Sequence, residues 1–81
     1  MVKVHLWASL RAYTDGKDVI EVDATNVGQL FTRLARAHPG LEDILENDVS
    51  VSIDGEIVVD DLTAKITPDS EVYLLRKVKG G

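Results

Sequence analysis

Residues 25–40 read TNVGQLFTRLARAHPG, and this segment has the periodicity of an amphipathic helix. Its apolar side chains recur three and four residues apart, which places them on one helix face: Val27, Leu30, Phe31, Leu34 and Ala35, with Ala37 or His38 beyond. Thr25 or Asn26 can cap the start by accepting a hydrogen bond from a free backbone N–H, and Pro39-Gly40 ends the helix. We therefore predict one main helix with a single apolar face.

Short β-strand patterns flank this helix on both sides. The expected strands are residues 2–7, 19–22, 49–53, 56–59 and 71–76, of which the first and third alternate cleanly between apolar and polar residues. Asp54-Gly55 is a strong hairpin signal, because a two-residue type I′ turn needs positive φ at both positions. Residues 41–45 fit a further turn of helix. Residues 60–70 form a polar crossing, with Leu62 and Ile66 as its expected apolar anchors.

This order of elements predicts an α+β fold. A single helix has to cover one face of one sheet, and the last strand then pairs with the first, parallel to it, at the sheet centre. The arrangement is the ubiquitin-like β-grasp, with a mixed sheet of about five strands and one main helix packed on one face. We expect residues 1–76 to form this domain and residues 77–81 to be a flexible C-terminal Gly-Gly tail.

Composition narrows the class of protein. The chain has 81 residues, which suits one domain, and 44% of them are hydrophobic, enough for a modest core. The absence of cysteine excludes disulfides, thiolate metal sites and a catalytic cysteine. No apolar run reaches transmembrane length, and the net charge of −5 argues against nucleic acid as the main partner. The cytoplasm is the default compartment.

Few side chains suggest chemistry of their own. His5 and His38 are the only histidines and lack metal-ligand spacing, so we expect no metal site. The acidic residues between 42 and 48 fit either a cation site or, more simply, a solvated charged face. We see no phosphate loop and no spacing typical of a catalytic triad, and we do not expect the chain to bind a cofactor or to catalyse a reaction alone.

The outer face of the central strands is a candidate partner-binding surface. If the alternate residues of the first strand face the helix, then Lys3, His5 and Trp7 face outward. In the last strand, the same alternation turns Tyr73 and Leu75 outward beside them. Trp7, Tyr73 and Leu75 together are typical of a protein-binding patch. The alternative is that Trp7 folds under a local loop.

The end of the chain is the second candidate site. All fourteen acidic residues precede Arg76, whereas three of the nine basic residues lie in the segment Arg76-Lys77-Val78-Lys79-Gly80-Gly81. Five residues beyond the last strand can reach roughly 16 Å. We expect the terminal carboxylate to enter a narrow active site on another protein, with Arg76 to Lys79 contacting that partner. The simpler reading is an ordinary frayed terminus.

Several short motifs resemble the β-grasp sulfur carriers, which include the small subunit of molybdopterin synthase (MoaD-like) and the thiamine-pathway carrier (ThiS-like). They are Val4 to Arg11, Thr25 to Leu30, His38 to Leu41, Val51 to Glu56, Asp69 to Val72 and Gly80-Gly81. The molybdopterin branch usually has prolines and small residues before the two glycines, whereas this chain has Arg76 to Lys79, which is closer to a ubiquitin-type tail.

The resemblance implies that Gly81 is the reactive residue and that Gly80 keeps the tail slender. An E1-like adenylating enzyme would use ATP to activate Gly81, and a sulfur donor would convert it to a thiocarboxylate. The role that we expect from the resemblance is the molybdopterin synthase small subunit in molybdenum cofactor biosynthesis, with the large subunit as partner.

Other functions stay open. The sulfur could serve another pathway (thiamine, cysteine or tRNA thiolation), or the chain could be a ubiquitin-like protein modifier. It could also be a non-reactive β-grasp interaction module. Fold alone does not decide among these.

Overall fold

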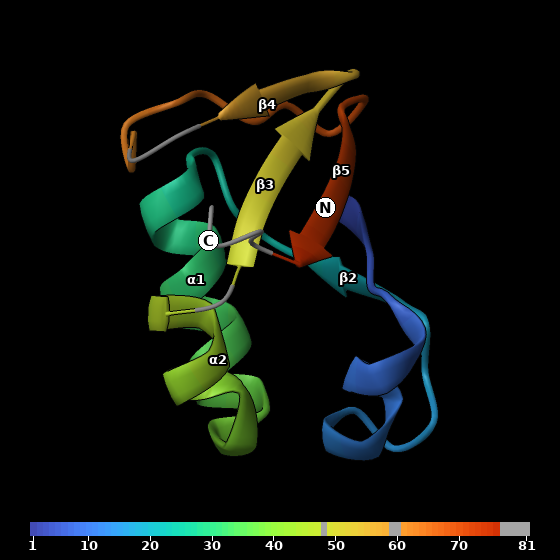
Figure 1. Ribbon diagram of the computed structural model, residues 1–81. Helices are drawn as coiled ribbons and strands as arrows, with labels where there is room; N and C mark the ends of the chain where they lie inside the picture. The colour runs from blue at the N-terminus through green and yellow to red at the C-terminus, as the bar shows by residue number, and fades with distance from the viewer. Residues whose placement is uncertain (48, 59–60, 77–81) are drawn as a thin grey trace, which may run out of the picture.

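The computed structural model describes residues 1–47, 49–58 and 61–76, and it contains one sheet with helices on one side (Figure 1). The elements in order are β1 (Val2–His5), η1 (Ala8–Tyr13), β2 (Val19–Val22), α1 (Val27–Ala37), η2 (Pro39–Leu41), α2 (Glu42–Asn47), β3 (Val49–Ile53), β4 (Glu56–Val58) and β5 (Glu71–Arg76). Here η denotes a 3₁₀-helix.

The sheet has the strand order β2-β1-β5-β3-β4. Strand β5 lies parallel to β1, with Val4 opposite Val72, and antiparallel to β3, with Val51 opposite Leu74. The two hairpins, β1–β2 and β3–β4, are antiparallel and form the outer parts of the sheet. The predicted α+β fold and the central parallel pair are therefore confirmed.

Helix α1 begins at a polar cap, as the sequence predicts. The Asn26 Oδ1 atom accepts a hydrogen bond from the Gln29 N–H at 2.8 Å. The Gln29 side chain reaches back, and its Oε1 accepts from both the N–H and the hydroxyl of Thr25, each at 2.9 Å. These bonds satisfy backbone donors that have no partner within the helix and so fix where it starts.

The core lies between α1 and the sheet face that α1 covers. The buried apolar residues are Val2, Val4, Leu6, Leu10, Val22, Ala24, Val27, Leu30, Leu34, Leu41, Leu45, Val51, Ile66, Val72 and Leu74. Ile66 anchors the crossing after β4, as predicted. Leu62 does not: its exposed fraction is 58%, because its segment runs beside the start of α1 and contributes its carbonyl to the Gly28 N–H at 2.9 Å.

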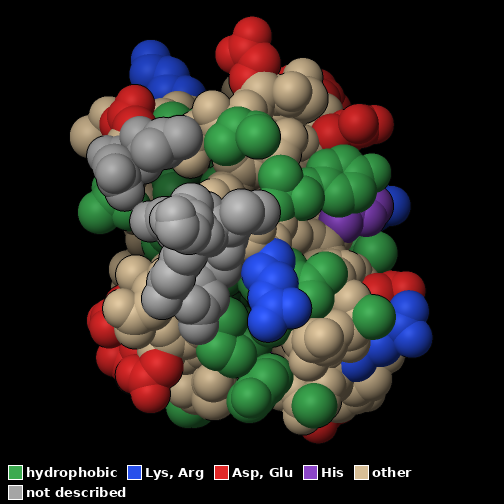
Figure 2. All heavy atoms as spheres, viewed as in Figure 1, with side chains coloured by type: hydrophobic (Ala, Val, Ile, Leu, Met, Phe, Trp, Pro, Cys, Tyr) green, Lys and Arg blue, Asp and Glu red, His purple; other side chains and the backbone are tan. Residues whose placement is uncertain are grey.

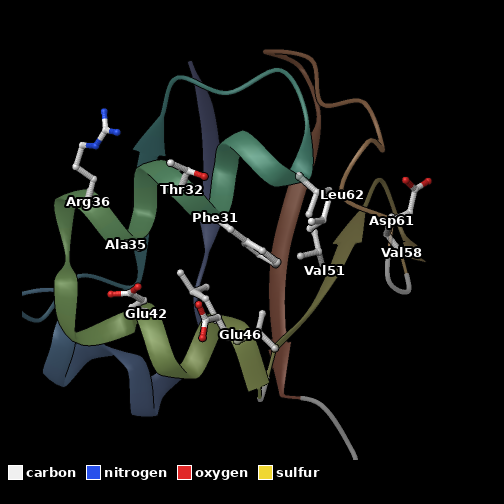
Figure 3. Close-up of a pocket in the computed structure, with 13 residues that line it drawn as sticks. Phe31, Thr32, Ala35, Arg36, Glu42, Glu46, Val51, Val58, Asp61 and Leu62 are labelled. Carbon is white, nitrogen blue, oxygen red and sulfur yellow. The ribbon is translucent and has the colours of Figure 1, made fainter.

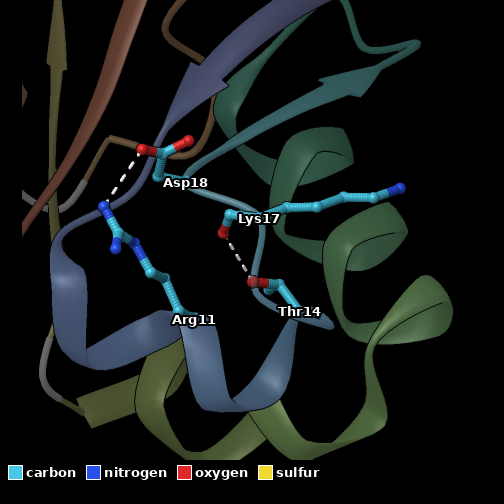
Figure 4. Close-up of polar contacts among 4 residues, drawn as sticks. All are labelled: Arg11, Thr14, Lys17 and Asp18. Atoms are coloured by element: carbon cyan, nitrogen blue, oxygen red, sulfur yellow. Dashed lines mark hydrogen bonds and ion pairs between the residues drawn. The ribbon is translucent and has the colours of Figure 1, made fainter.

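The connection between β1 and β2 is more ordered than the sequence indicated. Strand β1 ends at His5 rather than at Trp7, since residues 8–13 wind into η1. Thr14 is fully buried, and its hydroxyl donates to the Lys17 carbonyl at 2.7 Å (Figure 4). Arg11 pairs with Asp18 at 3.1 Å across the same turn. These contacts close the loop beside the core.

Candidate functional site: the outer sheet face and the end of β5

One row of side chains crosses the outer face of the whole sheet. The strand register aligns Val19, His5, Tyr73, Ser52 and Ile57 from β2 to β4. Three of them expose large apolar groups, with exposed fractions of 39% for Val19, 41% for Tyr73 and 62% for Ile57. We call these five residues the outer row. Figure 2 shows hydrophobic side chains at the surface on the side where β3 and β5 lie.

The centre of the outer row is held by an aromatic stack. The rings of His5 and Tyr73 lie 4.3 Å apart between centroids, with 14° between their planes. Both residues project from the central parallel pair, β1 and β5, so the pairing of these strands positions the two rings against each other without a partner. A partly exposed aromatic pair is the kind of feature that anchors protein interfaces.

Charged residues border the outer row on one side. Lys3 lies between Glu21 of β2 and Glu71 of β5 in the register of the sheet. Opposite charges on neighbouring strands are favourable and keep this border polar. The surface thus has an apolar centre and a charged margin, as specific protein interfaces do.

Trp7, which the sequence places on this face, lies just beyond the end of β1, and its part in partner binding stays a prediction. Trp7 is the N-cap of η1, and its backbone is still extended, with φ of −79° and ψ of 161°. Its side chain is half-buried and packs against the core cluster. This half-burial fits both the predicted patch and the alternative of a tryptophan folded beneath a local loop.

The remaining predicted site residues lie at the end of β5. Leu75 is half-buried and pairs with Ser50 of β3, on the same side of the strand as Tyr73. Arg76 is exposed and pairs with Val49. Lys77, Val78, Lys79, Gly80 and Gly81 lie outside the described residues. The structure therefore places Tyr73 and Leu75 on the same side of β5.

Strand alternation alone could have identified the residues that the sequence analysis left out of the patch. Val19 and Ile57 are outward positions of short hairpin strands, and His5 was expected to face outward but was not linked to Tyr73. What the sequence lacks is the register, because the stagger between β1 and β5 places His5 rather than a neighbour against Tyr73.

The described residues, 1–47, 49–58 and 61–76, give little support for a metal site or another reactive centre. Within these ranges, no three His, Cys, Asp or Glu side chains gather as metal ligands. One carboxyl group stands out: two hydrogen bonds from Thr63, at 2.6 Å from its hydroxyl and 3.0 Å from its N–H, lower the pKa of Asp61. Asp61 is on the surface, so these bonds fit a local turn. No described helix is long and apolar enough to span a membrane.

Solved structures share this fold. A chain of the Amycolatopsis orientalis BexX/CysO complex is 22% identical, covers all of both chains and superposes with a TM-score of 0.84. Small archaeal modifier protein 1 (SAMP1) from Haloferax volcanii is 27% identical over 99% of this chain and 98% of its own, with a TM-score of 0.76. A chain of the complex of subunits 1 and 2 of molybdopterin-converting factor from Helicobacter pylori 26695 is 18% identical over 99% and 97%, with a TM-score of 0.68.

Curated proteins include no significant match to the chain. The family model is more decisive, since it aligns with nearly the whole sequence. The model described as the ThiS family matches residues 4–81, from β1 through the final glycine. This chain therefore belongs to the ThiS family.

Proposed function

We propose that this protein is a sulfur carrier whose C-terminal glycine, Gly81, receives and delivers the sulfur. The observation that carries the proposal is the family match, which extends to residue 81 and so includes both terminal glycines. The fold supports it, because β5, the strand that precedes the tail, is held on both sides by β1 and β3. The chain would act with partner enzymes and not as a catalyst alone.

The proposed chemistry has two steps. A carboxylate is a poor acyl donor, so a Gly81 oxygen first attacks the α-phosphate of ATP in an E1-like enzyme, which forms the acyl-adenylate and releases pyrophosphate. A hydrosulfide ion then attacks the Gly81 carbonyl carbon, AMP leaves, and a thiocarboxylate remains; with a persulfide donor the product is an acyl disulfide, and a thiol reduces its S–S bond and is itself oxidised to a disulfide. Gly80 and Gly81 suit this route because they add no side chain to a narrow channel or beside the reacting carbonyl.

The outer row is the surface that we propose for the activating enzyme and for the sulfur acceptor. Its exposed tyrosine lies three residues before Arg76, on the strand that leads to the tail. A partner that binds this face therefore holds the body beside the point where the tail departs. The acceptor that we favour is a molybdopterin synthase large subunit, and a neighbour of the same fold is a subunit of molybdopterin-converting factor.

A second candidate function is protein modification. The SAMP1 chain is named a modifier protein, and the basic segment Arg76 to Lys79 before the glycines is typical of ubiquitin-type tails. In that case Gly81 forms isopeptide bonds with lysines of target proteins. Conjugates with this linkage, identified by mass spectrometry of proteolysed samples, would distinguish a modifier from a carrier that only forms the thiocarboxylate.

The test of the main proposal is an intact-mass measurement. The full chain is incubated with a ThiS-family activating enzyme, ATP and a sulfur source, and we expect one oxygen of Gly81 to be replaced by sulfur. A chain lacking Gly81 is the matched control and should stay unchanged. If an enzyme that thiolates its own carrier leaves this chain unmodified, the sulfur-carrier proposal fails.

The partner surface has its own test. Tyr73→Ala should weaken binding of the activating enzyme by about tenfold or more, as expected for a central aromatic anchor. Tyr13→Ala is the control, because Tyr13 is a tyrosine of similar exposure, 46% against 41%, located on η1 and away from the outer row. Equal binding by the two variants in isothermal titration calorimetry would remove the outer row from the interface.

A further inference from the structure

A second row of side chains runs beside the outer row, two residues nearer the start of β5. The strand register aligns Glu21 of β2, Lys3 of β1 and Glu71 of β5 in it. Asp54 extends this row toward the β3–β4 turn, since its carboxylate accepts the Glu71 N–H at 2.8 Å. Two residues of a strand separate the two rows by about 6.6 Å. We call these four residues the charged row.

The charged row is exposed and carries a net negative charge. It sets three carboxylates against one ammonium group, and all four residues are exposed. The ion pairs among the described residues are Arg11–Asp18 and Arg33–Asp23, so Lys3 forms no close ion pair with either glutamate beside it. The charged row therefore presents net negative charge to a partner.

A surface hollow of about 310 Å³ is lined by residues of both rows. Lys3, Glu21 and Glu71 of the charged row line it together with His5 of the outer row. His5 is also the ring that stacks on Tyr73. A basic side chain suits this hollow, because carboxylates attract its charge and the face of an aromatic ring favours a cation.

The two rows give the outer face a direction along β5. The charged row lies at the start of the strand, whereas the outer row and Leu75 lie nearer Arg76, the last described residue of the strand. Glu71 and Arg76 are about 17 Å apart in an extended strand. A partner that matches this face therefore places its apolar anchor toward the end of β5 and its positive charge away from that end.

We propose that the activating enzyme docks on this face with a basic side chain in the hollow, against the charged row. The choice of partner rests on the proposed function, in which the same enzyme binds the outer row. Complementary charge selects the orientation of a complex and speeds encounter more than it adds affinity. The charged row thus determines which way the bound body points, and the outer row supplies the apolar contact.

Two substitutions in the charged row should change binding of the activating enzyme in opposite directions. Glu71→Lys reverses one charge and should weaken binding about tenfold at low ionic strength, whereas Lys3→Gln removes the row's own cation and should tighten binding about threefold. Both changes should be largely lost in about 0.5 M salt, because exposed charges are then screened. Isothermal titration calorimetry with the full chain measures these affinities.

Glu56→Lys is the matched control, because it makes the same change of charge at an exposed acid on the other face of the sheet. Glu56 and Val58 alternate along β4 with the exposed Ile57 of the outer row. Val58 lines a cavity of about 750 Å³ on the helix side (Figure 3), which places Glu56 on that side too. The affinity of this variant should stay within about twofold of the unmodified chain, since the sheet separates the new charge from the partner.

Three results overturn the proposal. Tighter binding by Glu71→Lys would mean that the partner surface is acidic. Equal losses for Glu71→Lys and Glu56→Lys would mean that only the net charge of the chain matters, and unchanged binding by both charged-row variants would remove the row from the interface. Circular dichroism checks the folding of each variant, and Glu71→Gln, with an expected loss of about threefold, replaces Glu71→Lys should that variant not fold.

The proposed function is tested separately from the charged row. If Tyr73→Ala weakens binding and the charged-row variants do not, the outer row stays in the interface and only this inference fails. If the unmodified chain neither binds the activating enzyme nor gains sulfur in the intact-mass measurement, the proposed function fails and this inference fails with it.

Discussion

Asp54 is the residue whose replacement tests most directly how the hairpin β3–β4 is fastened to β5. Its backbone has φ of 52° and Gly55 has φ of 86°, which confirms the predicted turn with positive φ at both positions. The Asp54 carboxylate accepts the Glu71 N–H at 2.8 Å, and the Asp54 N–H donates to the Glu71 carbonyl at 2.9 Å. One residue therefore shapes the turn and ties it to the start of the strand that carries Tyr73.

Three substitutions at Asp54 separate the two contributions. Asn retains a side-chain acceptor and tolerates the left-handed conformation, so the free energy of unfolding should change little. Gly loses the side-chain hydrogen bond, which is worth roughly 1 kcal/mol net. Ala loses that bond and also adopts positive φ at a cost of about 1–2 kcal/mol. We therefore expect Ala to destabilise the protein by about 2–3 kcal/mol, more than Gly and far more than Asn.

Urea unfolding of the four proteins, followed by far-UV circular dichroism, measures these differences. A loss of 2 kcal/mol in a domain of this size lowers Tm by about 8–16 °C, so thermal unfolding gives an independent check. The order Asn, Gly, Ala in increasing loss is the critical result. If the Ala and Asn variants unfold at the same urea concentration, then neither the tolerance of Asn for positive φ nor the side-chain hydrogen bond to Glu71 contributes to stability.

Three other substitutions test separate parts of the structure. Gly40→Ala places a methyl group 2.9 Å from Tyr13 Cδ1 and should cost about 1 kcal/mol, a loss that Tyr13→Ala in the same chain should relieve in urea unfolding. Thr63→Val should raise the pKa of Asp61 in an NMR titration. Because the fold lowers this pKa, the ionised Asp61 stabilises the folded protein above its unfolded pKa, and this stabilisation is lost as pH falls through the folded pKa. The variant should lack that loss of stability at acid pH. Trp7→Ala should destabilise by about 2 kcal/mol, since the indole is half-buried against the core, and unchanged stability would favour the predicted place of Trp7 in the partner-binding patch.

Periodicity predicted most of the fold, because the helix and the strands each bury one face. Helix α1, with its cap at Asn26, and the turn at Asp54 follow from local residue chemistry that tertiary contacts did not override. Leu62 fails for the opposite reason. It is a large apolar residue in an irregular segment, where side-chain direction depends on contacts with distant residues and not on a repeating backbone.

The sequence predicted only part of the candidate site, because the site depends on the register between strands as well as on the alternation of side chains along each strand. Period two turned Tyr73 outward correctly, but one residue of stagger between β1 and β5 decides that His5 is its neighbour. The same pairing has a functional consequence. Val72 and Leu74 are buried in the core on one side of β5 while Tyr73 faces outward on the other, so the strand cannot shift without exposing both core residues. A shift of β5 would therefore lose the burial of Val72 and Leu74. The same burial keeps Tyr73, in the proposed partner surface, and Arg76, at the end of β5, at fixed positions on the sheet.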